Sequence, residues 1–206
     1  MQKRSININN YFLKSFNPVV KFLTISDIAI VGAGGLIVPI FALFVEDFIV
    51  GGNAAVAGMA AAVFLFTKSI FQIPIAYIID KIRGEKDDFW FLFTASVLMS
   101  FIPLLYLVIS TPLELYIVQF VYGLIVAMTF PSFMTLFTKN IDKGKEGVEW
   151  GVYFTLTDLV SAAFASIGGF LAVTYGYDSL IVIVSVLMFF GALLIYPIRR
   201  NIKGLN

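Results

Sequence analysis

Three ionisable side chains lie deep within long apolar runs of the sequence, namely Asp27, Lys68 and Asp158. A charged side chain in the hydrocarbon region of a bilayer costs about 2.5–3.5 kcal/mol on insertion scales, so it usually faces protein or pairs with another charge. Asp27 and Asp158 both share a helical stripe with small residues, which are typical of close helix packing. The pattern indicates chemistry in which a carboxylate binds a proton or a cation, or an ammonium group meets an anion.

Polar residues accompany these charges. Gln72 follows Lys68 by one helical turn, and Gln119 and Tyr122 share a helical face further along the chain. We therefore predict a substrate- or ion-binding cavity lined by Asp27, Lys68, Gln72, Gln119, Tyr122 and Asp158. The alternative is structural, because a buried Lys-Asp pair can simply satisfy itself. The residues leave open both this alternative and the choice between a cationic and an anionic solute.

The composition identifies the elements that must position these residues. Hydrophobic residues make up 60% of the 206 residues and charged residues only 13%, compared with about 25% in soluble domains. A membrane-crossing helix takes roughly 20 residues, so the length suits about six spans with short connections. We predict an all-α membrane protein with helices near residues 18–44, 54–79, 89–109, 112–137, 150–175 and 179–198.

Local signals mark several helix ends. Asn17 precedes Pro18 and predicts an N-cap, and Thr111 with Glu114 predicts a capping box. Glycines at Gly51 and Gly176 predict tight turns between apolar runs.

The basic residues indicate the orientation in the membrane. Of the 14 Lys and Arg residues, all except Lys68 lie before or at the start of the first predicted helix, between the second and third, between the fourth and fifth, or after the sixth. Cytoplasmic loops retain Lys and Arg, so both termini are predicted to be cytoplasmic in a multi-pass protein of the plasma (inner) membrane. We assign residues 1–17 as a cytoplasmic segment, 18–198 as the transmembrane domain and 199–206 as a basic cytoplasmic tail.

The stretch from Ala76 to Lys86, AYIIDKIRGEK, resembles the signature of the major facilitator superfamily, which lies between the second and third helices. Ala76 stands where glycine is usual, and Gly84 comes one place late. Gln119, Gly123 and Ala127 are similar to an Arg, Gly and Ala pattern of the fourth helix in that family, with Gln119 in place of Arg. Paired glycines at 168–169 are also typical of the family.

The resemblance implies a secondary transporter that works by alternating access, and it covers one six-helix half of the usual twelve spans. Two copies in one orientation could supply both halves through a two-fold axis along the membrane normal. We predict a parallel homodimer that is surrounded by membrane lipid and moves a small-molecule solute across the membrane, with a proton as a candidate coupling ion. The alternative is a non-transporting subunit, or a half that needs a different partner half.

In the dimer hypothesis the charged connector also acts as a gate. Asp80 would meet the N-terminus of the fifth helix near Trp150 of the other copy, where a carboxylate is favoured. Arg83 would pair with Glu149. The predicted gating residues are Asp80, Lys81, Arg83, Gly84, Glu149 and Trp150. The alternative is a solvated connector whose charges have no gating role.

Two proline positions suggest an internal repeat. Gly35 precedes Pro39, and Ala127 precedes Pro131, at the same four-residue spacing in the first and fourth helices. We predict helix breaks there, with two inverted three-helix repeats at about 18–109 and 112–198, an arrangement that points to a transporter's substrate site. The alternative is that proline is simply frequent in membrane helices.

Other classes of protein lack support. The chain has no Cys and no His, which excludes the common zinc sites, haem attachment and thiol nucleophiles. Motifs of membrane proteases and hydrolases are absent, so we predict no enzyme activity and no cofactor. The cytoplasmic positive charge needs no nucleic-acid partner to explain it.

Overall fold

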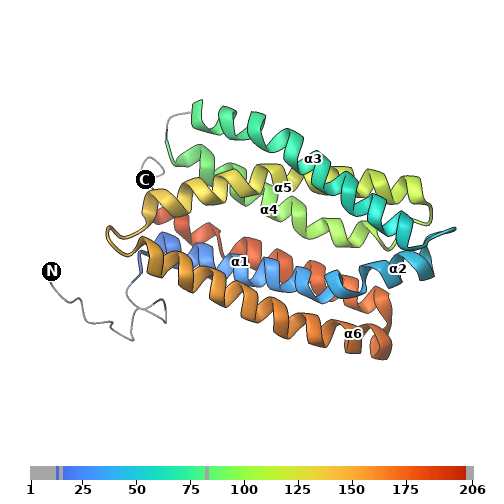
Figure 1. Cartoon of the computed structure of the whole chain (residues 1–206). Coiled ribbons are helices and arrows are strands. Elements are labelled where there is room, and N and C mark those ends of the chain that lie inside the picture. The colour runs from blue at the N-terminus through green and yellow to red at the C-terminus, as the bar shows by residue number, and fades with distance from the viewer. Residues whose placement is uncertain (1–12, 14–15, 82–83, 203–206) are drawn as a thin grey trace.

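The computed structural model describes residue 13 and residues 16–81 and 84–202, and the described segments are helical, with no strand among them. Figure 1 shows long helices running back and forth along one bundle axis. The elements are α1 (Pro18–Ile37), η2 (Val38–Ile40), α2 (Phe41–Phe48), α3 (Ala54–Lys81), α4 (Lys86–Leu105), α5 (Pro112–Asn140), α6 (Glu146–Leu193) and η3 (Tyr196–Asn201).

Within the described residues, five helical segments are long and apolar enough to cross a membrane, and the last of them spans 56 residues, Glu146–Asn201. This last segment folds back on itself at Gly176, whose φ of 82° and ψ of 161° are accessible mainly to glycine. We call residues 146–175 the first arm of α6 and residues 177–193 its second arm. The two arms run in opposite directions (Figure 1). The all-α membrane fold is thus confirmed, with the turn at Gly176 where the sequence predicts it.

The predicted helix caps are confirmed. Asn17 Oδ1 accepts a 2.9 Å hydrogen bond from the Val19 amide at the start of α1. At the start of α5, Glu114 Oε2 accepts from the Thr111 amide at 2.9 Å, and Thr111 Oγ1 accepts from the Glu114 amide at 3.4 Å. These bonds satisfy amides that have no partner inside a helix.

Several helices extend further than their apolar runs. α4 begins at Lys86 and α6 at Glu146, three and four residues before the predicted starts, and α5 continues to Asn140. Backbone hydrogen bonding does not require apolar side chains, and acidic residues are favoured in a first turn, as at Asp87 and Asp88 of α4. Hydropathy therefore located the spans but underestimated their polar ends.

The packing follows a regular pattern. α1 packs against α6, α5 packs against both α3 and α4, and α4 packs against α6. Close approach of backbones depends on glycine, as at Gly35 and Gly123. A Cβ at Gly35 of α1 would lie 2.9 Å from the Ser161 carbonyl of α6, and a Cβ at Gly123 of α5 would lie 2.8 Å from the Phe64 carbonyl of α3. Both are closer than Cβ atoms normally approach a backbone oxygen, so a side chain there would force the helices apart.

The two predicted helix breaks have different outcomes. Pro39 lies in η2, a short 3-10 segment that separates α1 from α2, so the first span is interrupted there. α5 continues through Pro131, and the break predicted between Ala127 and Pro131 is not observed. Serine and threonine side chains help helices to tolerate proline, and Ser132 Oγ donates a 3.0 Å hydrogen bond to the Met128 carbonyl in this turn.

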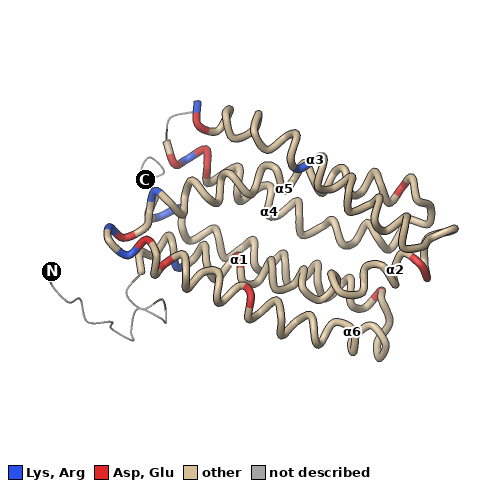
Figure 2. Tube along the Cα trace, in the orientation of Figure 1, with Lys and Arg blue, Asp and Glu red and all other residues tan. Residues whose placement is uncertain are grey.

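The two ends of the bundle differ in charge. Figure 2 shows Lys and Arg gathered at the end where α1 begins, with several acidic residues among them, while the charged residues at the other end of the described chain are acidic. We call the first the basic end. It contains the start of α1, the junction of α3 with α4, the junction of α5 with α6, and η3.

Candidate functional site

A cavity of about 640 Å³ lies between α1, α5 and the first arm of α6, with smaller contributions from α3, α4 and the second arm. Its walls are mainly apolar, and its polar members are hydroxyl groups and one carboxylate. The lining side chains that can form hydrogen bonds are Ser26, Asp27, Ser96, Tyr122, Thr129, Tyr153 and Ser161. Such a cavity, apolar with a few polar groups, is the usual form of a small-molecule site.

Asp27 supplies the only charged side chain among the described residues that line this cavity. The Tyr153 hydroxyl donates a 2.6 Å hydrogen bond to Asp27 Oδ2, across the contact between α1 and the first arm of α6. Asp27 is half-buried and forms no ion pair among the described residues. The carboxylate therefore has one strong neutral partner and remains available to a proton or a cation in the cavity.

Tyr153 was not among the residues predicted from sequence. It belongs to an aromatic cluster near the basic end, where its ring lies 5.4 Å from the Phe133 ring centroid and 5.7 Å from the Trp150 ring centroid. A tyrosine near the end of a membrane helix is usually explained as an interfacial residue. The sequence offers no signal that its hydroxyl faces Asp27, because the two lie 126 positions apart.

Tyr122 lines the cavity, as predicted, and stacks on Phe64 of α3 with ring centroids 4.7 Å apart. The hydroxyls of two other lining residues are already used. Ser26 Oγ donates to the Gly191 carbonyl at 2.8 Å, and Thr129 Oγ1 donates to the Val126 carbonyl at 3.2 Å. Ser161 Oγ is buried and has no hydrogen-bond partner among the described residues.

Gln119 does not lie in the cavity wall. Its side chain is buried, and its amide donates a 3.0 Å hydrogen bond to the Tyr106 hydroxyl in the apolar core. Gln119 and Tyr122 lie three positions apart on α5, but the Gln119 side chain lies in the core and the Tyr122 side chain lines the cavity. Gln72 is half-buried on α3 and is also outside the cavity lining. The expectation that both glutamine side chains line the cavity does not match their positions.

Lys68 and Asp158 lie on the outer helices that flank the cavity. Lys68 Nζ lies 5.0 Å from the centroid of the Phe130 ring, a cation–π distance, and Phe130 itself lines the cavity. Asp158 is exposed. Among the described residues the ion pairs are Lys139–Asp88 and Lys145–Asp142, so the alternative of a Lys-Asp pair within one chain at mid-depth is not observed.

The first of these two ion pairs joins α4 to α5 at the basic end. Lys139 Nζ of α5 lies 2.9 Å from Asp88 Oδ2 of α4, and the Asp88 side chain is only 2% exposed. The predicted gating residues Asp80, Lys81 and Gly84 lie at the junction of α3 with α4 and are exposed. Arg83 lies outside the described residues, so its predicted pairing with Glu149 stays a prediction.

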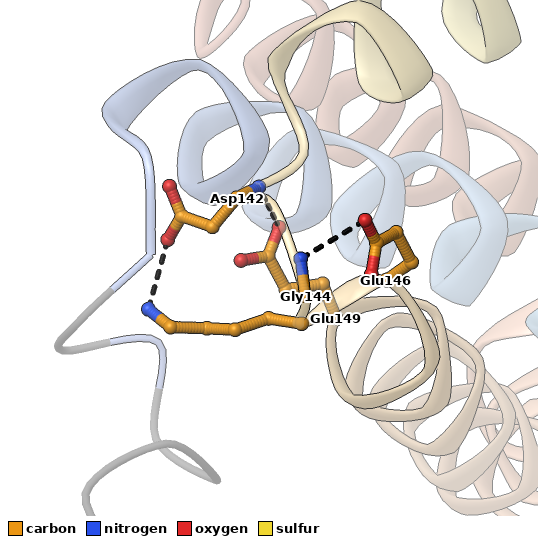
Figure 3. A network of polar contacts seen from close by, with 5 residues as sticks. Asp142, Gly144, Glu146 and Glu149 are labelled. Carbon is orange, nitrogen blue, oxygen red and sulfur yellow. Dashed lines mark hydrogen bonds and ion pairs between the residues drawn. The ribbon is translucent and has the colours of Figure 1, made fainter.

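Glu149, in the first turns of α6, is wholly buried beside the α5–α6 connection (Figure 3). Its Oε2 accepts a long, 3.4 Å hydrogen bond from the Asp142 amide, while Oε1 has no partner among the described residues. Lys145 Nζ bonds Asp142 Oδ2 at 3.0 Å in the same network. The neighbouring Trp150 ring stacks on Phe137 with centroids 4.2 Å apart. The network anchors the start of the first arm of α6.

The described residues contain no group of three or more His, Cys, Asp or Glu side chains that could hold a metal ion. The apolar helices indicate a multi-pass membrane protein, and the cavity lies between them. Residues 23–204 match the family model of the Major Facilitator Superfamily. The chain therefore belongs to the major facilitator superfamily, and it is a membrane transporter rather than an enzyme.

A named relative agrees with this assignment. The chain is 28% identical over 165 residues to the uncharacterised MFS-type transporter YitZ of Bacillus subtilis strain 168. The matched stretch covers 79% of this chain and 95% of that protein. The relative is therefore of similar size to this chain.

Proposed function

We propose that the protein is a secondary transporter that moves a small solute by alternating access, with Asp27 as the central binding group. The observation that carries this proposal is the position of Asp27 in the cavity, where it is held by Tyr153 at 2.6 Å. Aromatic and apolar side chains supply most of the remaining surface, including Phe64, Phe130 and Phe133. This surface suits a solute with an apolar body, and the carboxylate suits a cationic group on that solute or a coupling proton.

The functional unit in this proposal is a parallel homodimer. Family members usually have two six-helix halves, and this chain supplies one. An axis along the membrane normal would place the cavities of two copies face to face, with the basic ends of both in the cytoplasm. The match covers 95% of the Bacillus relative, so that protein shares most of this stretch of the chain.

The internal repeat is supported by the packing. If residues 18–109 and 112–198 are equivalent, α1 corresponds to α5, and the pair α3 and α4 corresponds to the two arms of α6. The contacts of α5 with α3 and α4 then match the contacts of α1 with α6. In this proposal the two repeats meet beside the cavity through α1 and α5. The matching positions on these two helices are Gly35 with Pro39 and Ala127 with Pro131.

For the gate, we retain the arrangement predicted from sequence. Asp80 at the end of α3 is exposed and free to approach the start of the first arm of α6 in the other copy, near Trp150. That contact would stabilise the state in which the basic end is closed, because a carboxylate is favoured at a helix N-terminus. Lys81, Arg83 and Gly84 would shape the connector, and Glu149 would accept Arg83.

Transport by the purified protein tests this function. The protein would be reconstituted into liposomes and supplied with a panel of organic cations, amino acids, sugars and carboxylates, with and without a pH gradient. We expect gradient-dependent uptake of at least one solute class, with the rate strongly reduced but still measurable in Asp27→Asn. Asp178→Asn, an exposed carboxylate at the other end of the bundle, is the matched control and should retain uptake. If Asp27→Asn transports at the wild-type rate, the site assignment is wrong. If the wild type moves no solute, a non-transporting subunit or a half with a different partner is favoured.

A further inference from the structure

Lys68 and Asp158 carry opposite charges at the same depth of the bundle. Lys68 precedes the end of α3 at Lys81 by 13 residues, and Asp158 follows the start of α6 at Glu146 by 12 residues. Both helix ends lie at the basic end. At about 1.5 Å per residue, the two side chains start roughly 20 Å and roughly 18 Å from that end. Both depths are near the middle of a hydrocarbon core of about 30 Å.

Neither charge is neutralised within the described part of the chain. Lys68 has only the Phe130 ring, 5.0 Å away, and Asp158 is exposed and takes part in neither of the recorded ion pairs. The other mid-depth carboxylate, Asp27, already accepts from Tyr153. An unpaired charge at this depth is costly, so a partner from outside the chain would stabilise both side chains.

The two residues stand on opposite sides of the cavity. Phe64, one turn before Lys68 on the same face of α3, lines the cavity, and so does Ala162, one turn after Asp158 on the same face of α6. Figure 1 shows α3 and the first arm of α6 at opposite edges of the bundle, with α1 and α5 between them. Lys68 and Asp158 therefore border the same cavity from its two outer helices.

A two-fold axis along the membrane normal turns this arrangement into a self-complementary surface. The rotation preserves depth and exchanges the two sides of the cavity, so α3 of one copy faces the first arm of α6 in the other. We propose that Lys68 forms an ion pair with the partner's Asp158, and Asp158 with the partner's Lys68, so that two reciprocal pairs join a dimer. This inference rests on the parallel dimer of the proposed function and names the contact that holds it together.

The surfaces around the two charges fit a second copy of this chain. Only 17% of the apolar window of α3 is buried, compared with 39–50% for the other candidate spans. The Asp158 face of α6 continues through small residues, which allow another helix to approach closely. These residues are Gly151, Thr155, Ala162, Ala165 and Gly169. In the proposed dimer, the opposite charges thus face each other between the large apolar side chains of α3 and the small side chains of the first arm of α6.

Cross-linking tests the pairing directly, because the chain contains no cysteine. Lys68→Cys and Asp158→Cys would be placed on separate chains with different tags and coexpressed. Their membranes would then be treated with a short bis-maleimide. We expect a product that carries both tags. Ile70→Cys with Asp158→Cys is the matched control, because Ile70 is exposed at nearly the same depth but lies about 200° around α3 from Lys68. Each single variant expressed alone should give much less dimer product.

Charge reversal provides a second readout that does not depend on cysteine chemistry. Lys68→Asp alone or Asp158→Lys alone should lower the dimer equilibrium constant by at least about tenfold, because each creates two like-charge contacts. The double variant restores opposite charges at both contacts and should recover the constant to within about threefold. The measurement is the dimer fraction in liposomes at varied protein density, obtained from single-molecule photobleaching.

The outcomes separate this inference from the proposed function. Suppose that the wild type is a transporting dimer but that Lys68→Cys gives no more cross-linked product with Asp158→Cys than Ile70→Cys does. The ion pairs are then wrong, and the transport function stands. If both reversals abolish transport but leave the dimer intact, and the double variant stays inactive, the two charges bind solute and the pairing is again overturned. A wild-type chain that is monomeric and inactive contradicts both proposals.

Discussion

The Tyr153 hydroxyl and the Asp27 carboxylate form a 2.6 Å hydrogen bond that joins the first arm of α6 to α1 at the cavity wall. A hydrogen bond to a charged group contributes about 1.5–3 kcal/mol. A solute cation or a coupling proton that reaches Asp27 must compete with this bond or share the carboxylate. In the proposed function, this bond would link occupancy of the cavity to the relative position of the two helices.

A double-mutant cycle tests this link. Tyr153→Phe removes the hydroxyl and keeps the ring, so we expect a clear reduction in uptake, and Asp27→Asn should reduce uptake further. Because the two groups contact each other, their effects on the transport rate should be non-additive by at least about 0.5 kcal/mol. The measurement is the initial rate in proteoliposomes for the wild type, both single variants and the double variant. Strict additivity would show that the two residues act independently.

The contact between α1 and α6 gives a matched pair of stability predictions. Gly35→Ala should lower the free energy of unfolding by about 1–3 kcal/mol, because the new Cβ would lie 2.9 Å from the Ser161 carbonyl. Gly34→Ala should have little effect, since a Cβ there meets nothing within 4 Å. Thermal unfolding of both variants in the same detergent provides the test. Equal stability of the two would contradict the described packing of α1 on α6.

The Lys139–Asp88 ion pair should stabilise the basic end. Lys139→Ala leaves the buried Asp88 carboxylate unpaired, and we expect a loss of about 1–3 kcal/mol, since Lys139 itself is 45% exposed and water can partly compensate. Lys143→Ala removes an exposed charge nearby and is the control. The free energy of unfolding is measured for both variants. A loss no larger than that of the control would mean that the pair contributes nothing.

Gln119 separates a structural role from a role in solute binding. Gln119→Leu should lower the free energy of unfolding by about 1–3 kcal/mol, because the buried Tyr106 hydroxyl loses its partner. The KM for solute should stay unchanged, because Gln119 lies outside the cavity lining. Tyr122→Ala, which changes the cavity wall, should raise KM instead. A raised KM with unchanged stability in Gln119→Leu would indicate that Gln119 contributes to solute binding after all.

Much of the fold could be predicted from the sequence because membrane helices carry strong local signals. Hydropathy located the spans, and the caps at Asn17 and Thr111 mark helix starts through side chains that bond their own backbone. Helix ends were less accurate, because polar turns such as those at Asp88 and Glu149 continue a helix beyond its apolar run. The effect of Pro131 also depended on its context, since the turn around it keeps α5 continuous.

The candidate site was predicted only in part. Asp27 and Tyr122 could be found because polar groups at mid-depth are rare and costly, and both line the cavity. The sequence could not show that Gln119 bonds Tyr106 or that Tyr153 bonds Asp27, because those contacts depend on the rotation of one helix against another. Periodicity in such apolar helices is too weak to fix that rotation.

The central claim is that the chain works as a dimer with Asp27 at a shared site. The most direct test is to coexpress wild-type and Asp27→Asn chains in known ratios and to measure transport in liposomes that contain both. If one site needs two copies, the flux should depart from a straight line as the fraction of Asp27→Asn chains rises, falling roughly as the square of the wild-type fraction when both carboxylates are required. A flux that falls in strict proportion to the wild-type fraction would show that each chain works alone and would contradict the account.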